Sequence, residues 1–325
     1  MAVTRDDEVR MDRSTLAEIA RLYYLGNLSK VDIALKYGIS RFRVARALTQ
    51  ARDEGIVSIT IQGVAPVDPW TSYQLSQHWG IAATVVDSGS GMDRAVRQAV
   101  GHATAEVFMD NAREDAIVGF AWGRTLTAMT DYVTRLPKLS VVQLIGAVTS
   151  DLDESPVELV RRTSASSGGR AYPIIAPAIL DNEHALAALK SNPDVKAALD
   201  LFDALDMAFV AVGSWDPPAS QIRGVLPQAD LDRLDELAVK AEVAGVYFDS
   251  QGRIVAEDYS RRYLCISADQ LRRVPRLVAA AGGRIKMEAV KAVVRSGMIT
   301  DLVTDHTLAE AALQSEAITP ASGLR

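Results

Sequence analysis

One stretch of sequence decides the architecture of the N-terminal part of the chain: SKVDIALKYGISRFRVARALTQAR, residues 29–52. Ser29 stands at a helix N-cap position, and Asp32 stands where the acidic residue of a capping box would stand. Gly38 permits a tight turn, and Ser40 is placed to cap the next helix. Apolar residues recur every three to four positions on both sides of this turn. The stretch therefore predicts two short helices joined by a four-residue link, which is a helix-turn-helix.

A third helix precedes this pair. Leu16, Ile19, Ala20 and Tyr23 recur at the spacing of one apolar helical face, and Gly26-Asn27 ends the pattern. Three apolar residues of the last helix are expected to face the other two: Val44, Ala45 and Leu48.

The last helix also carries the charges of the module. In a helix-turn-helix its first turns enter the major groove, where arginine side chains meet guanine edges or phosphates. A solvated basic face would carry the same charges, but the N-cap, the turn glycine and the arginines coincide at the spacing that DNA binding needs. The residues expected to contact DNA are Ser40, Arg41, Phe42, Arg43 and Arg46.

Charge is distributed unevenly along the 325 residues. The net charge is -6, yet residues 28–52 hold six basic residues and one acid. A small basic region on an acidic body suggests a separate module with a polyanionic partner, here double-stranded operator DNA.

Other classes of protein are disfavoured by composition. The single cysteine, Cys265, excludes an internal disulfide framework, and the four histidines show no paired metal-ligand spacing. The N-terminus has no apolar signal segment, and the apolar runs are far shorter than a membrane span. The sequence predicts a cytoplasmic protein with no membrane partner, no metal site, no cofactor and no catalytic residue.

The boundary between two domains is expected in a proline- and glycine-containing link over residues 62–69. Ser58–Ile61, just before it, alternates like a short strand or wing. We therefore assign residues 1–62 to a DNA-binding domain and residues 63–325 to a second, larger domain.

The second domain shows α/β alternation, which predicts a mainly parallel sheet covered by helices on both faces. The expected strands are Thr84–Asp87, Ala116–Ala121, Val141–Gly146, Ala171–Ile175, Met207–Val212, Gly245–Phe248, Leu277–Ala281 and Leu302–Thr304. The expected helices are Ala95–Asp110, Leu126–Arg135, Ala185–Leu189, Leu231–Ala238, Lys286–Ser296 and Leu308–Gln314.

Ligands of such sheets bind beyond the carboxyl ends of the strands. The strongest candidate is residues 119–125, where a strand runs into a helix and Gly123 permits a close turn; residues 281–286 and 211–214 follow two other strands. Glu242 and Asp249 flank the strand ending at residue 248. Each segment also has a plain interpretation as an ordinary turn or a solvated strand end. The candidate effector-binding residues are Gly123, Arg124, Thr125, Gly213, Glu242, Asp249, Gly283 and Lys286.

Taken together, these segments resemble the sugar-responsive bacterial regulators of the SorC/DeoR type. The resemblance spans nearly the whole chain, through residues 38–57, 119–126, 244–249, 282–286 and Thr304-Asp305. It implies a DNA-binding head over residues 1–62. It also implies that residues 63–325 form a sugar or sugar-phosphate effector-binding and oligomerisation domain, similar to the sugar-phosphate isomerase and deaminase fold.

The resemblance also implies roles for individual residues and a homo-oligomer, either a dimer or a tetramer. Gly123, Arg124 and Thr125 would hold a phosphate or its equivalent, Glu242 would contact effector hydroxyls, and Lys286 would be a basic contact. Some relatives carry a basic residue where this chain has Ile145, which disfavours a doubly phosphorylated sugar.

Two functions are compatible with these features. The first is a transcriptional regulator of a carbohydrate or polyol operon, whose operator affinity responds to a sugar phosphate or polyol. The alternative is a sugar-phosphate isomerase or deaminase with a basic N-terminal extension. Such an enzyme needs a positioned acid–base pair, and none is evident in the sequence, so the regulator is the favoured prediction.

Overall fold

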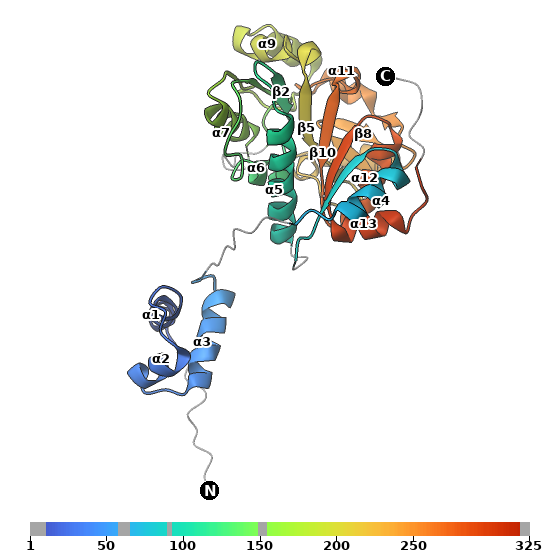
Figure 1. Ribbon diagram of the computed structural model, residues 1–325. Helices are drawn as coiled ribbons and strands as arrows, with labels where there is room; N and C mark the ends of the chain where they lie inside the picture. Colours follow the sequence, from blue (N-terminus) through green and yellow to red (C-terminus); the bar gives the residue numbers. More distant parts are fainter. Residues whose placement is uncertain (1–10, 58–65, 90–92, 149–154, 319–325) are drawn as a thin grey trace. The chain divides into compact units, whose positions relative to one another are not determined.

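The computed structural model of the chain describes residues 11–57, 66–89, 93–148 and 155–318. The chain divides into two compact units, Met1–Gly63 and Val64–Arg325, of which the first is helical and the second is α/β (Figure 1). The strand or wing expected over Ser58–Ile61 lies outside the described residues.

The N-terminal unit is a three-helix bundle that contains the predicted helix-turn-helix. Its helices are α1 (Arg13–Tyr24), α2 (Lys30–Tyr37) and α3 (Arg41–Asp53). Ser29 and Asp32 form the predicted capping box of α2, and Gly38 ends that helix in the left-handed conformation with φ 63°. The Ser40 hydroxyl accepts a hydrogen bond from the Arg43 amide at 3.1 Å and caps α3.

The core of this unit confirms most of the expected apolar face and corrects part of it. Val44 and Leu48 are buried as predicted, but Ala45 is only half-buried. The helical period instead brings Ala47 and Ala51 inward, because these residues lie three and seven positions after Val44. They pack with Leu16, Ile19, Ala20, Ile33 and Ala34.

The large unit is built on a seven-stranded sheet in the order β1-β11-β10-β5-β2-β3-β4, and every described pairing in it is parallel. The strands are β1 (Ala82–Val86), β2 (Ile117–Phe120), β3 (Ser140–Gln143), β4 (Ala171–Tyr172), β5 (Met207–Ala211), β10 (Arg276–Ala280) and β11 (Asp301–Asp305). This confirms the predicted mainly parallel sheet.

Helices cover both faces of the sheet and create two apolar layers. Within β10, Val278 and Ala280 face one layer, while Leu277 and Ala279 face the other. The first layer is completed by α5 (Asp93–Asn111), α6 (Arg124–Met129) and α7 (Pro156–Ser167). The second is completed by α4 (Pro69–Trp79), α8 (Glu183–Lys190), α9 (Pro193–Leu199), α10 (Gln228–Glu236), α11 (Ala268–Arg273), α12 (Met287–Arg295) and α13 (His306–Leu313).

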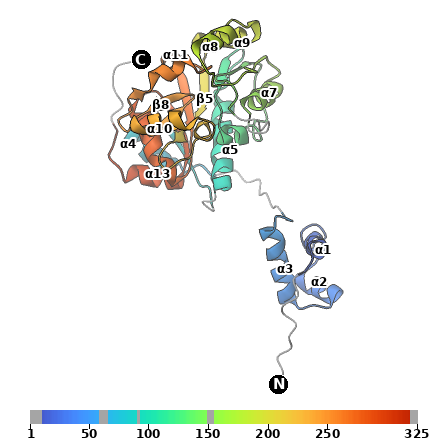
Figure 2. The same cartoon turned by 180° about the vertical axis from the view of Figure 1, so that it is seen from behind.

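A second sheet, which the sequence did not predict, packs in the same layer as α12, near α10 (Figure 2). It is antiparallel, in the order β6 (Gly213–Ser214), β7 (Ala241–Val243), β8 (Val246–Phe248) and β9 (Ile254–Val255). The expectation that Gly245–Phe248 belongs to the parallel sheet is therefore wrong. Ala244 and Gly245 both have positive φ, at 50° and 85°, so they form a two-residue hairpin, whereas a parallel pair would need a long crossover.

Two expected helices differ from the structure at the ends that matter for the site. The helix expected to run from Leu126 to Arg135 ends at Met129, and the Thr130 hydroxyl then bonds the Thr127 carbonyl at 2.7 Å. The helix expected to begin at Lys286 begins at Met287, after a 3-10 turn over Arg284–Lys286.

Candidate functional site

A cavity of about 590 Å³ lies at the carboxyl ends of β2, β5, β10 and β11. It brings together seven of the eight predicted effector-binding residues: Gly123, Arg124, Thr125, Gly213, Glu242, Gly283 and Lys286. Other residues of the three expected segments also line the cavity: Trp122, Ala211, Val212, Gly282, Arg284 and Ile285. Residues outside those segments, which were not expected from the sequence, complete the lining: Asp93, Val96, Arg97, Pro218, Ala219, Ser220, Gln221 and Thr307.

Gly123 forms the turn from β2 into α6. Its φ is 149°, and a Cβ atom built on it would lie 2.4 Å from the Cβ of Ala211 on β5. Only glycine therefore lets the chain pass so close to the neighbouring strand. This contact fixes Arg124, which is exposed, and Thr125, which is buried, at the mouth of the cavity.

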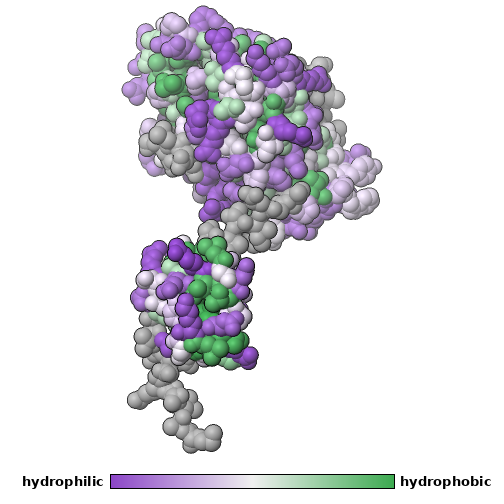
Figure 3. All heavy atoms as spheres, turned by 60° about the vertical axis from the view of Figure 1, so that its left-hand side comes forward, coloured by the Kyte–Doolittle hydropathy of each residue, from purple (hydrophilic) through white to green (hydrophobic). Residues whose placement is uncertain are grey.

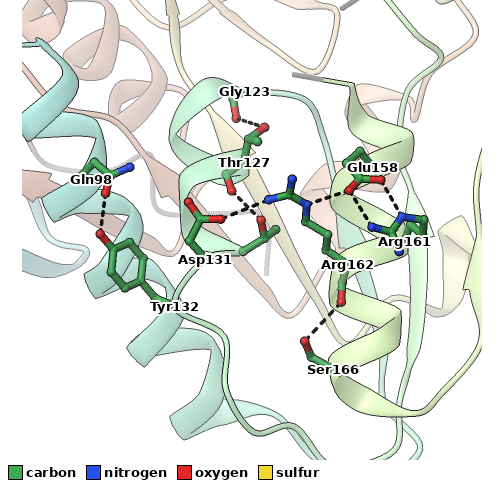
Figure 4. Close-up of polar contacts among 10 residues, drawn as sticks. Gln98, Gly123, Thr127, Asp131, Tyr132, Glu158, Arg161, Arg162 and Ser166 are labelled. Atoms are coloured by element: carbon green, nitrogen blue, oxygen red, sulfur yellow. Dashed lines mark hydrogen bonds and ion pairs between the residues drawn. The ribbon is translucent and has the colours of Figure 1, made fainter. Parts of the chain in front are cut away.

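The far end of α6 is held by polar contacts with its neighbours (Figure 4). The Arg162 side chain on α7 pairs with Asp131, which follows α6, at 3.1 Å, and with Glu158 in its own helix at 2.8 Å. The Tyr132 hydroxyl donates a hydrogen bond to the Gln98 side chain on α5 at 2.6 Å. These contacts anchor the segment that carries Arg124 and Thr125.

A second turn, after β10, shapes the opposite wall of the cavity. Gly283 has a φ of 89°, and its amide donates a 2.7 Å hydrogen bond to the Asp305 carboxylate. The same carboxylate caps α13 through Thr307. The turn is thereby tied to the end of β11, and Lys286 follows directly on it.

Lys286 is the central charge of the site. Its Nζ donates a 2.9 Å hydrogen bond to the carbonyl of Val212, the residue that follows β5. Burial, followed by the nearby Arg124 cation, lowers the pKa of Lys286 from its ordinary 10.5 to about 8. Among the described residues, neither Arg124 nor Lys286 forms an ion pair. An anion bound between them would relieve their mutual repulsion and favour the charged lysine.

Glu242 supplies a buried carboxyl group on the same cavity. It does not stand ahead of a strand as expected but within β7, opposite Gly213 of β6, with 2% of its surface exposed. One carboxyl oxygen accepts from the Gly245 amide at 2.7 Å, and the other accepts from the Ser220 hydroxyl at 3.3 Å. Burial raises the pKa of Glu242 to about 7, so its carboxyl group changes charge near neutral pH.

Gly213 makes this arrangement possible. A Cβ atom there would lie 2.8 Å from the Glu242 carboxylate and 2.7 Å from the Ser220 hydroxyl. No sequence signal marked Ser220, because it lies in an irregular segment and reaches the site only through the fold.

Asp249 is the predicted effector residue that the structure does not bring to the cavity. It lies in the turn between β8 and β9, where it accepts hydrogen bonds from the Gln251 and Arg253 amides at 2.9 and 3.0 Å. Its carboxylate also pairs with the Arg253 side chain at 2.7 Å.

Ile145, the position where some relatives are basic, is fully buried. Its backbone forms an isolated antiparallel β-bridge with Cys265.

In the N-terminal unit, the residues predicted to bind DNA gather at the start of α3. Arg41, Phe42 and Arg46 are exposed, while Arg43 is half-buried. The Arg41 guanidinium lies over the Phe42 ring, 5.0 Å from its centroid.

A histidine–carboxylate pair that the sequence did not predict joins α13 to α4. His306 Nε2 lies 2.8 Å from the Asp68 carboxylate, and Asp68 is the N-cap of α4. The described residues that line the cavity include no histidine. The described residues contain no cluster of His, Cys, Asp and Glu suited to a metal ion, and none of their helices is long and apolar enough to cross a membrane.

Comparisons with known proteins agree with the fold. Residues 68–314 match the family model described as "Putative sugar-binding domain". The sorbitol operon regulator of Klebsiella pneumoniae is 27% identical over 322 residues, covering 95% of this chain and 99% of the regulator. The erythritol catabolism regulatory protein EryD of Brucella abortus is 25% identical over 306 residues, covering 92% of this chain and 96% of EryD.

The fold is shared with a solved structure of one of these relatives. The crystal structure of the full-length Klebsiella pneumoniae regulator SorC superposes with a TM-score of 0.69 at 24% identity, covering 92% of this chain and 98% of that one. The chain belongs to the sugar-binding domain family of SorC/DeoR-type transcriptional regulators.

Proposed function

We propose that this chain is a DNA-binding transcriptional regulator of a carbohydrate or polyol catabolic operon. An effector that carries an anionic group and hydroxyls, such as a sugar phosphate or an acidic polyol derivative, occupies the cavity and changes the affinity for operator DNA. The observation that carries the proposal is that two cations and one buried carboxyl group line the same cavity. The cations are Arg124 and Lys286, which have no ion-pair partner among the described residues, and the carboxyl group is that of Glu242.

Each charge of the cavity has a role in this proposal. Lys286 supplies a point charge and Arg124 a planar fork for two oxygens of the anion. Glu242 accepts hydrogen bonds from hydroxyls of the effector. The names of two relatives, a sorbitol operon regulator and an erythritol catabolism regulator, support a polyol or carbohydrate operon.

The effector is tested by a thermal-shift screen of sugar phosphates against the matching free polyols, because a ligand that binds only the folded state raises its melting temperature. We expect phosphorylated compounds to stabilise the protein more than their free counterparts. Lys286→Ala should weaken binding of the best compound by about 10-fold or more, as charge-assisted hydrogen bonds contribute roughly 1.5–3 kcal/mol. Lys196→Ala is the matched control, since Lys196 of α9 forms an exposed ion pair with Asp200, the C-cap of that helix. Equal binding in the wild type and Lys286→Ala would contradict the site.

Assembly follows from the DNA-binding function. A single helix-turn-helix covers a short half-site, so tight binding needs two heads on a two-fold axis. In this proposal residues 1–62 read the DNA, residues 63–325 bind the effector and join subunits, and the protein acts in the cytoplasm as a dimer or tetramer. Light scattering should give a multiple of 35.0 kDa; a monomer with and without DNA would refute the assembly.

The enzyme alternative is tested directly. Steady turnover of any sugar phosphate that binds the cavity would show that the protein is an isomerase or deaminase. We expect binding without product.

A further inference from the structure

The first turn of α3 contains a large apolar side chain exposed among cations. Phe42 has 66% of its surface exposed, with Arg41 and Arg43 on either side of it in the chain. Exposed apolar residues are common on protein surfaces, and Leu25 and Leu35 of the same unit are more exposed still, at 78% and 77%. Exposure alone is therefore no evidence that Phe42 has a role in binding.

The position of Phe42 on the helix is more informative. Val44, Ala47, Leu48 and Ala51 face the core. Phe42, Arg46 and Thr49 are exposed and recur at i, i+4 and i+7, which places them on one face of α3 turned away from that core. This outward face is the one that a helix-turn-helix lays into the major groove, with its N-terminal residues against the base edges.

The chemistry of the ring restricts what it can contact there. A phenyl ring cannot form hydrogen bonds with phosphates, and among the major-groove edges the thymine 5-methyl group is the apolar one. The Arg41 guanidinium lies over the Phe42 ring, so the ring is held beside a cation that suits a neighbouring phosphate. Figure 3 shows apolar side chains of the N-terminal unit gathered between hydrophilic ones on the face in view, a surface of mixed character rather than a uniformly cationic one.

We propose that Phe42 is a specificity-determining residue that contacts the 5-methyl group of a thymine in the operator. This inference rests on the proposed function and adds to it a particular kind of base. Arg41 then contacts the backbone, and Phe42 distinguishes thymine from the bases that lack a methyl group.

The test uses the full chain and a DNA duplex that it has itself selected from a random-sequence pool. Each thymine of the duplex is replaced in turn by deoxyuracil, which removes the methyl group and leaves the base pairing unchanged. The wild type should lose about three- to tenfold in affinity at one thymine of each half-site, since one buried methyl group is removed from an apolar contact. At other thymines the affinity should stay the same.

The decisive comparison is a double-mutant cycle with Phe42→Ala. This variant should bind the thymine duplex less tightly than the wild type and should show no further loss on the deoxyuracil duplex. Leu25→Ala is the matched control, because Leu25 is an exposed apolar residue of the same unit that follows α1 and lies outside α3, and it should show the full wild-type loss. Circular dichroism and light scattering of Phe42→Ala without DNA should match the wild type.

Several results would overturn the inference. The first is a full deoxyuracil penalty retained in Phe42→Ala, and the second is a wild type indifferent to every thymine methyl group. A Phe42→Ala variant that weakens binding to both duplexes by the same factor, with the penalty unchanged, would make Phe42 a positioning residue for Arg41. A fall in oligomeric mass would place the ring in a contact between subunits. If the wild type selects no duplex at all, the proposed function fails with the inference; if it selects one and the cycle is additive, only the inference fails.

Discussion

The affinity of the cavity for an anionic effector should fall steeply in mildly alkaline solution, and Lys286 should cause the fall. Without a ligand, burial and Arg124 lower the pKa of this lysine to about 8. A bound anion favours the charged ammonium and raises the pKa again. The effector therefore prefers the protein in which Lys286 is protonated. The fraction of protein in this form falls with each pH unit above 8.

The size of the effect follows from linkage. If the anion restores the ordinary value of 10.5, affinity should drop about 15-fold between pH 8 and pH 9.5. This window avoids two other titrations. A phosphate monoester, with a second pKa near 6, is dianionic throughout the window. Glu242, whose pKa is about 7, is largely ionised at pH 8, the lower end of the window.

Isothermal titration calorimetry at constant ionic strength measures the profile, with the phosphorylated compound that gives the largest thermal shift. Lys286→Gln should bind weakly and with a nearly flat profile, while Lys196→Gln should retain the wild-type slope. Circular dichroism at pH 9.5 checks that the protein is still folded. A wild-type affinity that is constant across the window, or an equal slope in Lys286→Gln, would refute the role given to this lysine.

Three further variants test other parts of the molecule. Gly123→Ala should abolish effector binding and lower the melting temperature, because its Cβ would meet that of Ala211 at 2.4 Å, whereas Gly224→Ala, with nothing within 4 Å, should do neither. The raised pKa of Glu242, about 7, means that the folded state holds a proton which the unfolded state has released, so stability is lost as pH rises from about 4.5 to 7. Glu242→Gln should remove up to about 3 kcal/mol of that pH dependence in denaturant titrations, and an unchanged slope would contradict the buried carboxyl group. Arg46→Ala should cost about 1–3 kcal/mol of operator affinity in gel-shift titrations if it reads a base; affinity equal to the wild type would remove Arg46 from the interface.

The helix-turn-helix and the parallel strands could be predicted because their signals are local. The capping box at Ser29, the glycine at 38 and the cap at Ser40 each fix a helix end within a few residues. The strands β5 and β10 are short apolar runs, as strands buried on both faces must be.

Three helices that were not expected from the sequence share one local signal. In α4, α7 and α9 a proline at the first helical position follows a capping residue: Asp68, Ser155 and Asn192. Proline is favoured at that position because the missing amide would have no partner there. Pro69, the last residue of the expected linker, is in the structure the first residue of α4.

The second sheet and the environment of Glu242 were harder to predict. The hairpin from β7 to β8 turns through Ala244-Gly245, and alanine rarely adopts a positive φ. The burial of Glu242 depends on Gly213, some thirty residues earlier, and on the hydroxyl of Ser220. Such contacts come from the tertiary fold, and no local pattern of residues encodes them.

If a ligand of the cavity controls DNA binding, the affinity for operator DNA must differ between the free and the ligand-bound protein. The measurement is a fluorescence-anisotropy titration of a selected duplex at fixed salt, since salt alone changes such affinities strongly. A ligand can shift the equilibrium only if it binds one state more tightly than the other. We predict that the phosphorylated compound bound at Lys286 changes operator affinity at least several-fold, in either direction. Saturation of the cavity by that compound with operator affinity unchanged would show that the cavity does not control DNA binding.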